Sequence, residues 1–157
     1  YRSAFIQLAN YYATVEDKDK VREIFKKLND VMTPSVIPFT NSQLENWVNA
    51  YQVYSGLVGV DTLNTQNFRQ DQLEDMARVL MTLKEVDAAE KAFMEILQVN
   101  PDNIQAKAHL VDIYASRKQY DKSIEILEEW LEQNPKDASA RRRMEQYRKL
   151  MENENKN

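Results

Sequence analysis

The chain has 157 residues, enough for one ordinary domain that buries roughly two thirds of the surface its unfolded form exposes. Because it contains no cysteine, disulfides, thiolate metal sites and cysteine nucleophiles are excluded. The formal net charge of -4 argues against nucleic acid as a partner, and apolar runs of only a few residues predict no membrane insertion by this chain.

The first predicted element is a pair of amphipathic helices within residues 1–34. Apolar side chains recur there at spacings of three and four residues, at Phe5, Leu8, Ala9 and Tyr12 and again at Val21, Phe25 and Leu28. The second helix should end near Pro34, because a residue that precedes proline disfavours the α region. Tyr1 stands where an initiator Met would be, so we expect a processed chain or a piece of a longer protein.

Residues 41–69 predict a degenerate second repeat, made of one further helix and an irregular segment. Ser42 with Glu45 three residues later forms the pattern of a capping box, and apolar periodicity follows. A second helix is not evident, because residues 57–69 lack a clean period, follow Gly56 and include Gly59. We expect a loop or a short irregular helix over 57–69.

The strongest pattern is an internal repeat of 34 residues. Residues 70–103 align without a gap on 104–137, and the Asn-Pro pair at Pro101 falls on the one at Pro135. Apolar residues have a helical period in both halves of each window, with a polar break between the halves. Each window therefore predicts two amphipathic helices.

These windows resemble the tetratricopeptide repeat family. The resemblance is carried by the small, bulky, small and proline positions of that repeat, occupied here by Ala77/Val111, Leu80/Tyr114, Ala89/Ser123 and Pro101/Pro135. A further small position is replaced by Ile96 and Trp130. The resemblance implies an all-α, right-handed α-solenoid of antiparallel helix pairs, with about three to four repeats in a single domain of residues 1–157.

The predicted domain ends with a capping helix over 138–152. This helix is rich in arginine, whereas the preceding helix carries Glu125, Glu128 and Glu132, so opposite charges should help the two to dock. The run Arg141-Arg142-Arg143 could contact phosphates, but three successive helical residues spread around the helix. We therefore favour pairing within the chain over nucleic-acid binding.

A narrower resemblance rests on the opening YRSAFIQLANYY and on VMTPSVIPF, followed by helical repeats. This arrangement resembles the C-terminal region of bacterial membrane proteins that are similar to protein O-mannosyltransferases. The resemblance implies a periplasmic or extracellular location for the module; without it, the chain would be cytoplasmic.

The resemblance to tetratricopeptide repeats also implies where a partner would bind. In this family the concave face is lined by fixed positions of each first helix, and the candidate partner-binding residues at those positions are Asn10, Glu45, Asn49, Gln52, Glu74, Arg78 and Asp112. Asparagine can both donate to and accept from an extended main chain. Solvated side chains without a binding role are the alternative interpretation of these positions.

The sequence offers no pattern for catalysis, and we expect neither an enzyme nor a cofactor. His109 is the single histidine, so no second imidazole can complete a zinc site. The leading hypothesis is a non-catalytic scaffold that binds a peptide or protein on its concave face. One alternative is a self-assembling subunit of an oligomer or extracellular filament, with exposed seams at Phe5, Ile6 and the patch Leu57, Val58 and Val60. The other is an accessory domain of a bacterial membrane glycosyltransferase.

Overall fold

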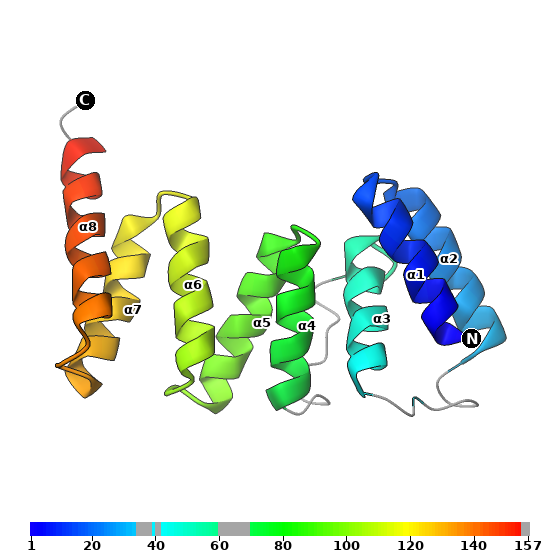
Figure 1. The fold of residues 1–157 in the computed structure, drawn as a ribbon, viewed down its shortest axis with the longest axis horizontal. Coiled ribbons are helices and arrows are strands. Elements are labelled where there is room, and N and C mark those ends of the chain that lie inside the picture. Colours follow the sequence, from blue (N-terminus) through cyan, green and yellow to red (C-terminus); the bar gives the residue numbers. More distant parts are fainter. Residues whose placement is uncertain (34–38, 40–41, 60–69, 155–157) are drawn as a thin grey trace. The chain divides into compact units, whose positions relative to one another are not determined.

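The computed structural model describes residues 1–33, 39, 42–59 and 70–154, and no strand occurs among these residues (Figure 1). This part forms eight helices, namely α1 (Arg2–Thr14), α2 (Lys18–Val31), α3 (Ser42–Tyr54), α4 (Gln70–Thr82), α5 (Val86–Val99), α6 (Ile104–Ser116), α7 (Tyr120–Gln133) and α8 (Ala138–Glu154). The predicted all-α fold of tetratricopeptide-like helical hairpins is confirmed. The chain divides into two compact units, Tyr1–Ile96 and Leu97–Asn157.

The same turn ends α1, α3, α4 and α6. Its defining residue has a positive φ in every case, namely Glu16 (58°), Gly56 (67°), Lys84 (60°) and Lys118 (59°). In each turn the following N–H donates to the carbonyl five residues earlier at 2.9 Å, and the N–H of the positive-φ residue donates to the carbonyl three residues earlier. This pair of hydrogen bonds is the Schellman motif, which satisfies the last carbonyls of a helix.

The positions of these turns extend the 34-residue spacing to the first hairpin. Lys84 lies two such periods after Glu16, and Lys118 lies one period after Lys84. Ala50, one period after Glu16, is instead completely buried inside α3. The second repeat is therefore out of register, and its turn comes later, at Gly56.

The irregular segment predicted after α3 is only partly described. Residues 57–59 are not helical, in agreement with the prediction, whereas 60–69 lie outside the described residues. Pro34 and the side chain of Ser42 also lie outside them, so the capping box stays a prediction. The helix before Pro34 ends at Val31.

The core of the first unit lies between α1, α2 and α3. Ala9 of α1 and Phe25 of α2 pack with Tyr51 of α3, and all three are fully buried. The rings of Phe25 and Tyr51 stack with their centroids 5.6 Å apart. Burying a large apolar side chain of this kind contributes about 1.5–3 kcal/mol. α3 also packs along α4, so it lies between the α1–α2 hairpin and α4.

The second small position of the repeat is buried in both windows. Ala89 in α5 and Ser123 in α7 have no exposed surface. The hydroxyl of Ser123 donates to the carbonyl oxygen of Val111 at 3.1 Å, which fastens α7 to α6. A small side chain at this position lets the paired helices approach each other.

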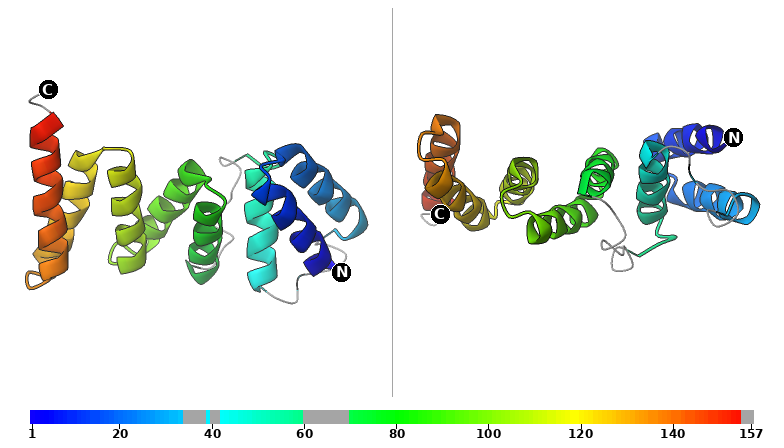
Figure 2. Two further views of the ribbon diagram at one scale, coloured as in Figure 1. Left: turned by 45° about the horizontal axis from the view of Figure 1, so that its top comes forward. Right: turned by 90° about the horizontal axis from the view of Figure 1, so that it is seen from below.

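The second unit is closed by α8, which packs along α7 (Figure 2). Trp130 of α7 donates its indole N–H to Asp137 at 2.9 Å. Asp137 also accepts from the backbone N–H groups of Ser139 and Ala140 at 2.9 and 3.0 Å, so it caps the start of α8. These three hydrogen bonds hold the end of α7 and the start of α8 together.

The predicted charge complementarity between α7 and α8 is confirmed. Arg148 of α8 pairs with Glu128 of α7 at 2.6 Å, with both side chains about half exposed. The three consecutive arginines diverge around the helix, as predicted. Arg141 donates to the carbonyl oxygen of Pro135 at 2.5 Å, whereas Arg143 pairs with Asp112 of α6.

Candidate functional site

The largest opening described in the first unit, which we call the turn cleft, has a volume of about 560 Å³. It lies where the ends of α1 and α3 meet the start of α2 and the α4–α5 turn. Its lining residues are Asn10, Ala13, Thr14, Glu16, Lys18, Tyr54, Thr82, Leu83, Lys84 and Glu85. The cleft thus brings together segments that are more than two helices apart in the chain.

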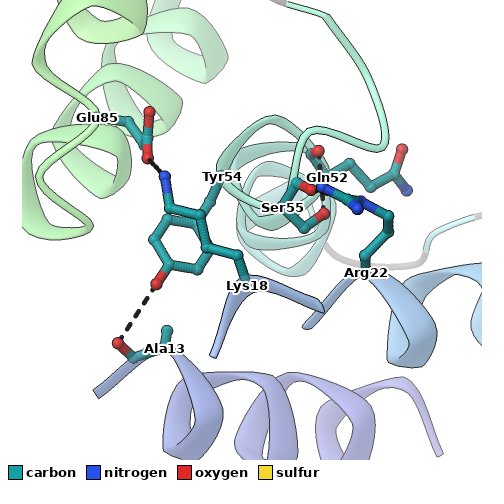
Figure 3. A network of polar contacts seen from close by, with 7 residues as sticks. All are labelled: Ala13, Lys18, Arg22, Gln52, Tyr54, Ser55 and Glu85. Atoms are coloured by element: carbon teal, nitrogen blue, oxygen red, sulfur yellow. Dashed lines mark hydrogen bonds and ion pairs between the residues drawn. The ribbon is translucent and has the colours of Figure 1, made fainter. Parts of the chain in front are cut away.

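Two ion pairs join the turns on either side of the turn cleft. The ammonium of Lys18 lies 2.5 Å from a carboxylate oxygen of Glu85 and 4.8 Å from the centre of the Tyr54 ring (Figure 3). Lys84 pairs with Glu16 at 3.5 Å, at a more exposed position. Two ammonium groups therefore face two carboxylates, so the charge of the cleft is balanced.

Tyr54 forms an aromatic wall of the turn cleft. Its hydroxyl donates to the carbonyl oxygen of Ala13 at 3.5 Å, which connects α3 to α1 (Figure 3). Burial raises the pKa of the Tyr54 hydroxyl, an effect that the charge of Lys18 opposes. The ring is 5% exposed and lies beneath the ammonium of Lys18, so it contributes a mostly covered wall beside charged groups that already have partners.

The predicted binding residues of α1 and α3 are partly engaged within the first unit. The hydroxyl of Tyr51 donates to the amide oxygen of Asn10 at 3.0 Å, and burial raises the pKa of Tyr51 to about 12. Gln52 donates to the amide oxygen of Asn29 at 3.4 Å. Glu45 and Asn49, on the same helix, are half-buried. Asn10 keeps an exposed surface and lines the turn cleft.

A second opening, the α3–α4 cleft, has a volume of about 230 Å³. It is lined by Asn46, Trp47, Asp75, Arg78, Val79 and Thr82. Thr82 also lines the turn cleft, so the two openings adjoin. Of the predicted residues of α4, Arg78 lines this cleft and pairs with Asp75, whereas Glu74 is half-buried.

Asn46 was not among the residues predicted from the sequence, yet it lies at the base of the α3–α4 cleft. It shares a helix face with Ala50 and Val53, at spacings of four and seven residues, and all three are buried. An asparagine in line with two buried apolar residues was the sequence signal that could have identified it.

Asp112, the predicted binding residue of the second unit, is exposed on α6, where its carboxylate accepts a hydrogen bond from Arg143 of α8. Arg143 also donates to the hydroxyl of Tyr147 at 3.1 Å. His109 is half-buried on the same helix. Across residues 1–33, 39, 42–59 and 70–154, no cluster of three or more His, Asp or Glu side chains could hold a metal ion.

The same described ranges contain no helix with the length and apolar character of a membrane span. Searches of curated proteins and of solved structures gave no match to the chain. The narrower resemblance to the C-terminal region of O-mannosyltransferase-like proteins is therefore not supported by these comparisons. A family model described as tetratricopeptide repeat matches residues 80–147, which run from the end of α4 into α8.

Proposed function

We propose that the chain is a non-catalytic scaffold that binds a polypeptide at the adjoining clefts of its first unit. Tetratricopeptide repeats generally mediate protein–protein interaction and are typically not catalytic, which supports this class of function. The observation that carries the proposal is that Asn10 and Arg78, both predicted partner-binding residues, line two openings that share Thr82.

The balanced charge of the turn cleft supports a neutral, extended segment as the occupant. Lys18 already pairs with the partly buried Glu85 at 2.5 Å, so an anionic ligand would have to displace that carboxylate. A neutral main chain can instead form hydrogen bonds with the exposed carboxamide of Asn10. Binding through Glu45, Asn49, Gln52, Glu74 and Asp112 stays a prediction.

A photo-cross-linking residue at Thr82 tests this proposal, because Thr82 is exposed and borders both clefts. Peptides first selected from a random unstructured library against the immobilised protein serve as probes. We expect these peptides to cross-link at Thr82 and not at Lys26, an exposed residue of α2 that serves as the matched control. A library that yields no binder, or cross-links that form only at Lys26, would contradict the proposal.

Self-association is the second candidate function, and the surface of α1 favours it. Leu8, Tyr11 and Val15 are 48%, 62% and 58% exposed, respectively. The seams predicted from the sequence differ from this surface, because Phe5, Ile6 and Leu57 pack against the core of the first unit. Light scattering over a concentration series should give a rising mass if α1 joins copies, and a constant mass if it does not.

A role as an accessory domain of a membrane glycosyltransferase stays a prediction, together with the periplasmic or extracellular location that it implies. The coding sequence upstream of this chain would test it. A multi-helix membrane segment encoded there would support the role, and its absence would exclude it.

A further inference from the structure

The carboxamide of Asn46 is buried without a hydrogen-bond partner. The residue is 1% exposed, and neither its amide oxygen nor its amide nitrogen has a partner within the part of the chain that the structure describes. Buried polar groups are nearly always paired, because a group removed from water without a new partner destabilises the fold. Both polar atoms of Asn46 are thus left without a protein partner among the described residues.

The surroundings of Asn46 show where a partner could come from. Trp47 and Val79 give the α3–α4 cleft aromatic and aliphatic walls, and the pair Arg78–Asp75 lies at its solvent edge, where both side chains are about half exposed. The hydroxyl of Thr82 donates to the carbonyl oxygen of Arg78 at 3.0 Å. These polar neighbours thus have partners already, whereas neither the amide nitrogen nor the amide oxygen of Asn46 has one among the described residues.

We propose that the α3–α4 cleft binds a side-chain carboxamide, that of glutamine or asparagine, presented by the polypeptide that the first unit holds. This inference rests on the proposed function for its ligand, since the polypeptide supplies the side chain. Two carboxamides pair through two N–H···O bonds, which satisfy both atoms of Asn46 at once. A cleft of about 230 Å³ has room for one side chain between Trp47 and Val79.

Other side chains fit this site less well. An aliphatic group leaves both polar atoms of Asn46 unpaired, and a carboxylate places its oxygen against the amide oxygen and near the charge of Asp75. An ammonium group has no acceptor for the amide nitrogen of Asn46. A main chain could supply a donor and an acceptor, but Asn46 is recessed, and the narrow end of a side chain reaches a recessed group more easily than a chain with flanking residues.

Two small probes test the inference without a partner protein. N-acetylglutamine methylamide and N-acetylnorleucine methylamide are similar in size, and only the first carries a side-chain carboxamide. We expect the glutamine probe to shift the nuclear magnetic resonance signals of the Asn46 side-chain amide and to bind at least about tenfold more tightly than the norleucine probe. Equal binding of the two probes, or unshifted Asn46 signals, would overturn the inference.

The variant Asn46→Leu adds an independent readout. We expect it to lose the preference for the glutamine probe and to melt at a higher temperature than the wild type, since it removes two unpaired buried atoms. The matched control is Asn29→Leu, which changes a half-buried asparagine of α2 that lines neither cleft and should keep the preference. A melting temperature for Asn46→Leu at or below that of the wild type would mean that the amide has a partner, such as bound water, and would overturn the inference.

The outcomes separate this inference from the proposed function. If selected peptides cross-link at Thr82 but show no preference for glutamine, the carboxamide site is rejected and the scaffold function remains. If the glutamine probe binds at Asn46 but no peptide cross-links at Thr82, the carboxamide site remains and the scaffold function is rejected.

Discussion

Replacing Lys84 by glycine should stabilise the first unit. Lys84 adopts φ 60° in the Schellman turn after α4, a conformation that costs a residue with a Cβ about 1–2 kcal/mol. Glycine avoids this strain, but it gives the unfolded chain more conformational freedom, which lowers the stability of the folded state by about 0.4–1 kcal/mol relative to a residue with a Cβ. The exposed ion pair with Glu16, at 3.5 Å, contributes almost nothing. We therefore expect a net gain of about 0.5–1 kcal/mol in the free energy of unfolding.

Urea unfolding followed by far-ultraviolet circular dichroism measures this gain. Two control variants, which should both lose stability, test whether the gain depends on the positive φ of Lys84. Lys26→Gly, in the exposed interior of α2, should lose about 1 kcal/mol, because glycine weakens a regular helix. Gly56→Ala should also lose stability, since φ there is 67° and the added Cβ would lie 3.3 Å from a guanidinium nitrogen of Arg22. The reasoning would be refuted if Lys84→Gly lost as much stability as Lys26→Gly.

Three further outcomes are expected. Ser123→Leu should lower the free energy of unfolding by about 1–3 kcal/mol, because it overpacks a fully buried position, whereas Glu128→Leu should leave the free energy of unfolding nearly unchanged. Equal melting temperatures of the two variants would show that the assigned repeat register is wrong. Burial raises the pKa of Tyr51 to about 12 from an ordinary value of 10, so stability falls as the pH rises between these values, by up to about 2.7 kcal/mol. Tyr51→Phe should remove this dependence in alkaline urea titrations, and an unchanged slope would exclude Tyr51 as its source. The pKa of Asp137 is lowered by hydrogen bonds from the Ala140 backbone and the Trp130 indole, so the stability that its carboxylate contributes is lost as the pH falls through the acid range. The variant Asp137→Ala should therefore melt at a lower temperature near neutral pH and depend less on pH in the acid range. An unchanged acid transition would contradict this.

The helical hairpins could be predicted from sequence because they depend on local patterns. The spacing of apolar residues and the Asn-Pro pairs defined α4 to α7 without reference to tertiary contacts. The Schellman turns at Glu16, Lys84 and Lys118 were not predicted, because these residues with positive φ are not the glycine or asparagine that usually marks such a turn. Their equivalence is seen only in the structure, where the same backbone conformation recurs at multiples of 34 residues.

The binding residues were harder to predict, because their availability depends on partners distant in the chain. Asp112 has its cation on α8, 31 residues away, and Asn10 has its donor on α3, 41 residues away. The register of a single helix gives the direction of a side chain but not the group that it meets. Asn46 was not predicted as a candidate site residue, because asparagine in a helix is ordinarily assigned to the solvent-exposed surface.

The ion pair between Lys18 and Glu85 has a consequence for folding kinetics. It joins residues 67 positions apart, and α1 also packs on α3, so the first unit forms only after long loops have closed. Helices that are neighbours in the chain pack on each other in both units, as α1 does on α2 and α6 on α7, but the contacts of α1 with α3 and of Lys18 with Glu85 close longer loops in the first unit. Contacts between sequential helices close short loops and form faster. During refolding, α6, α7 and α8 should therefore gain protection from hydrogen exchange before α1 and α2 do.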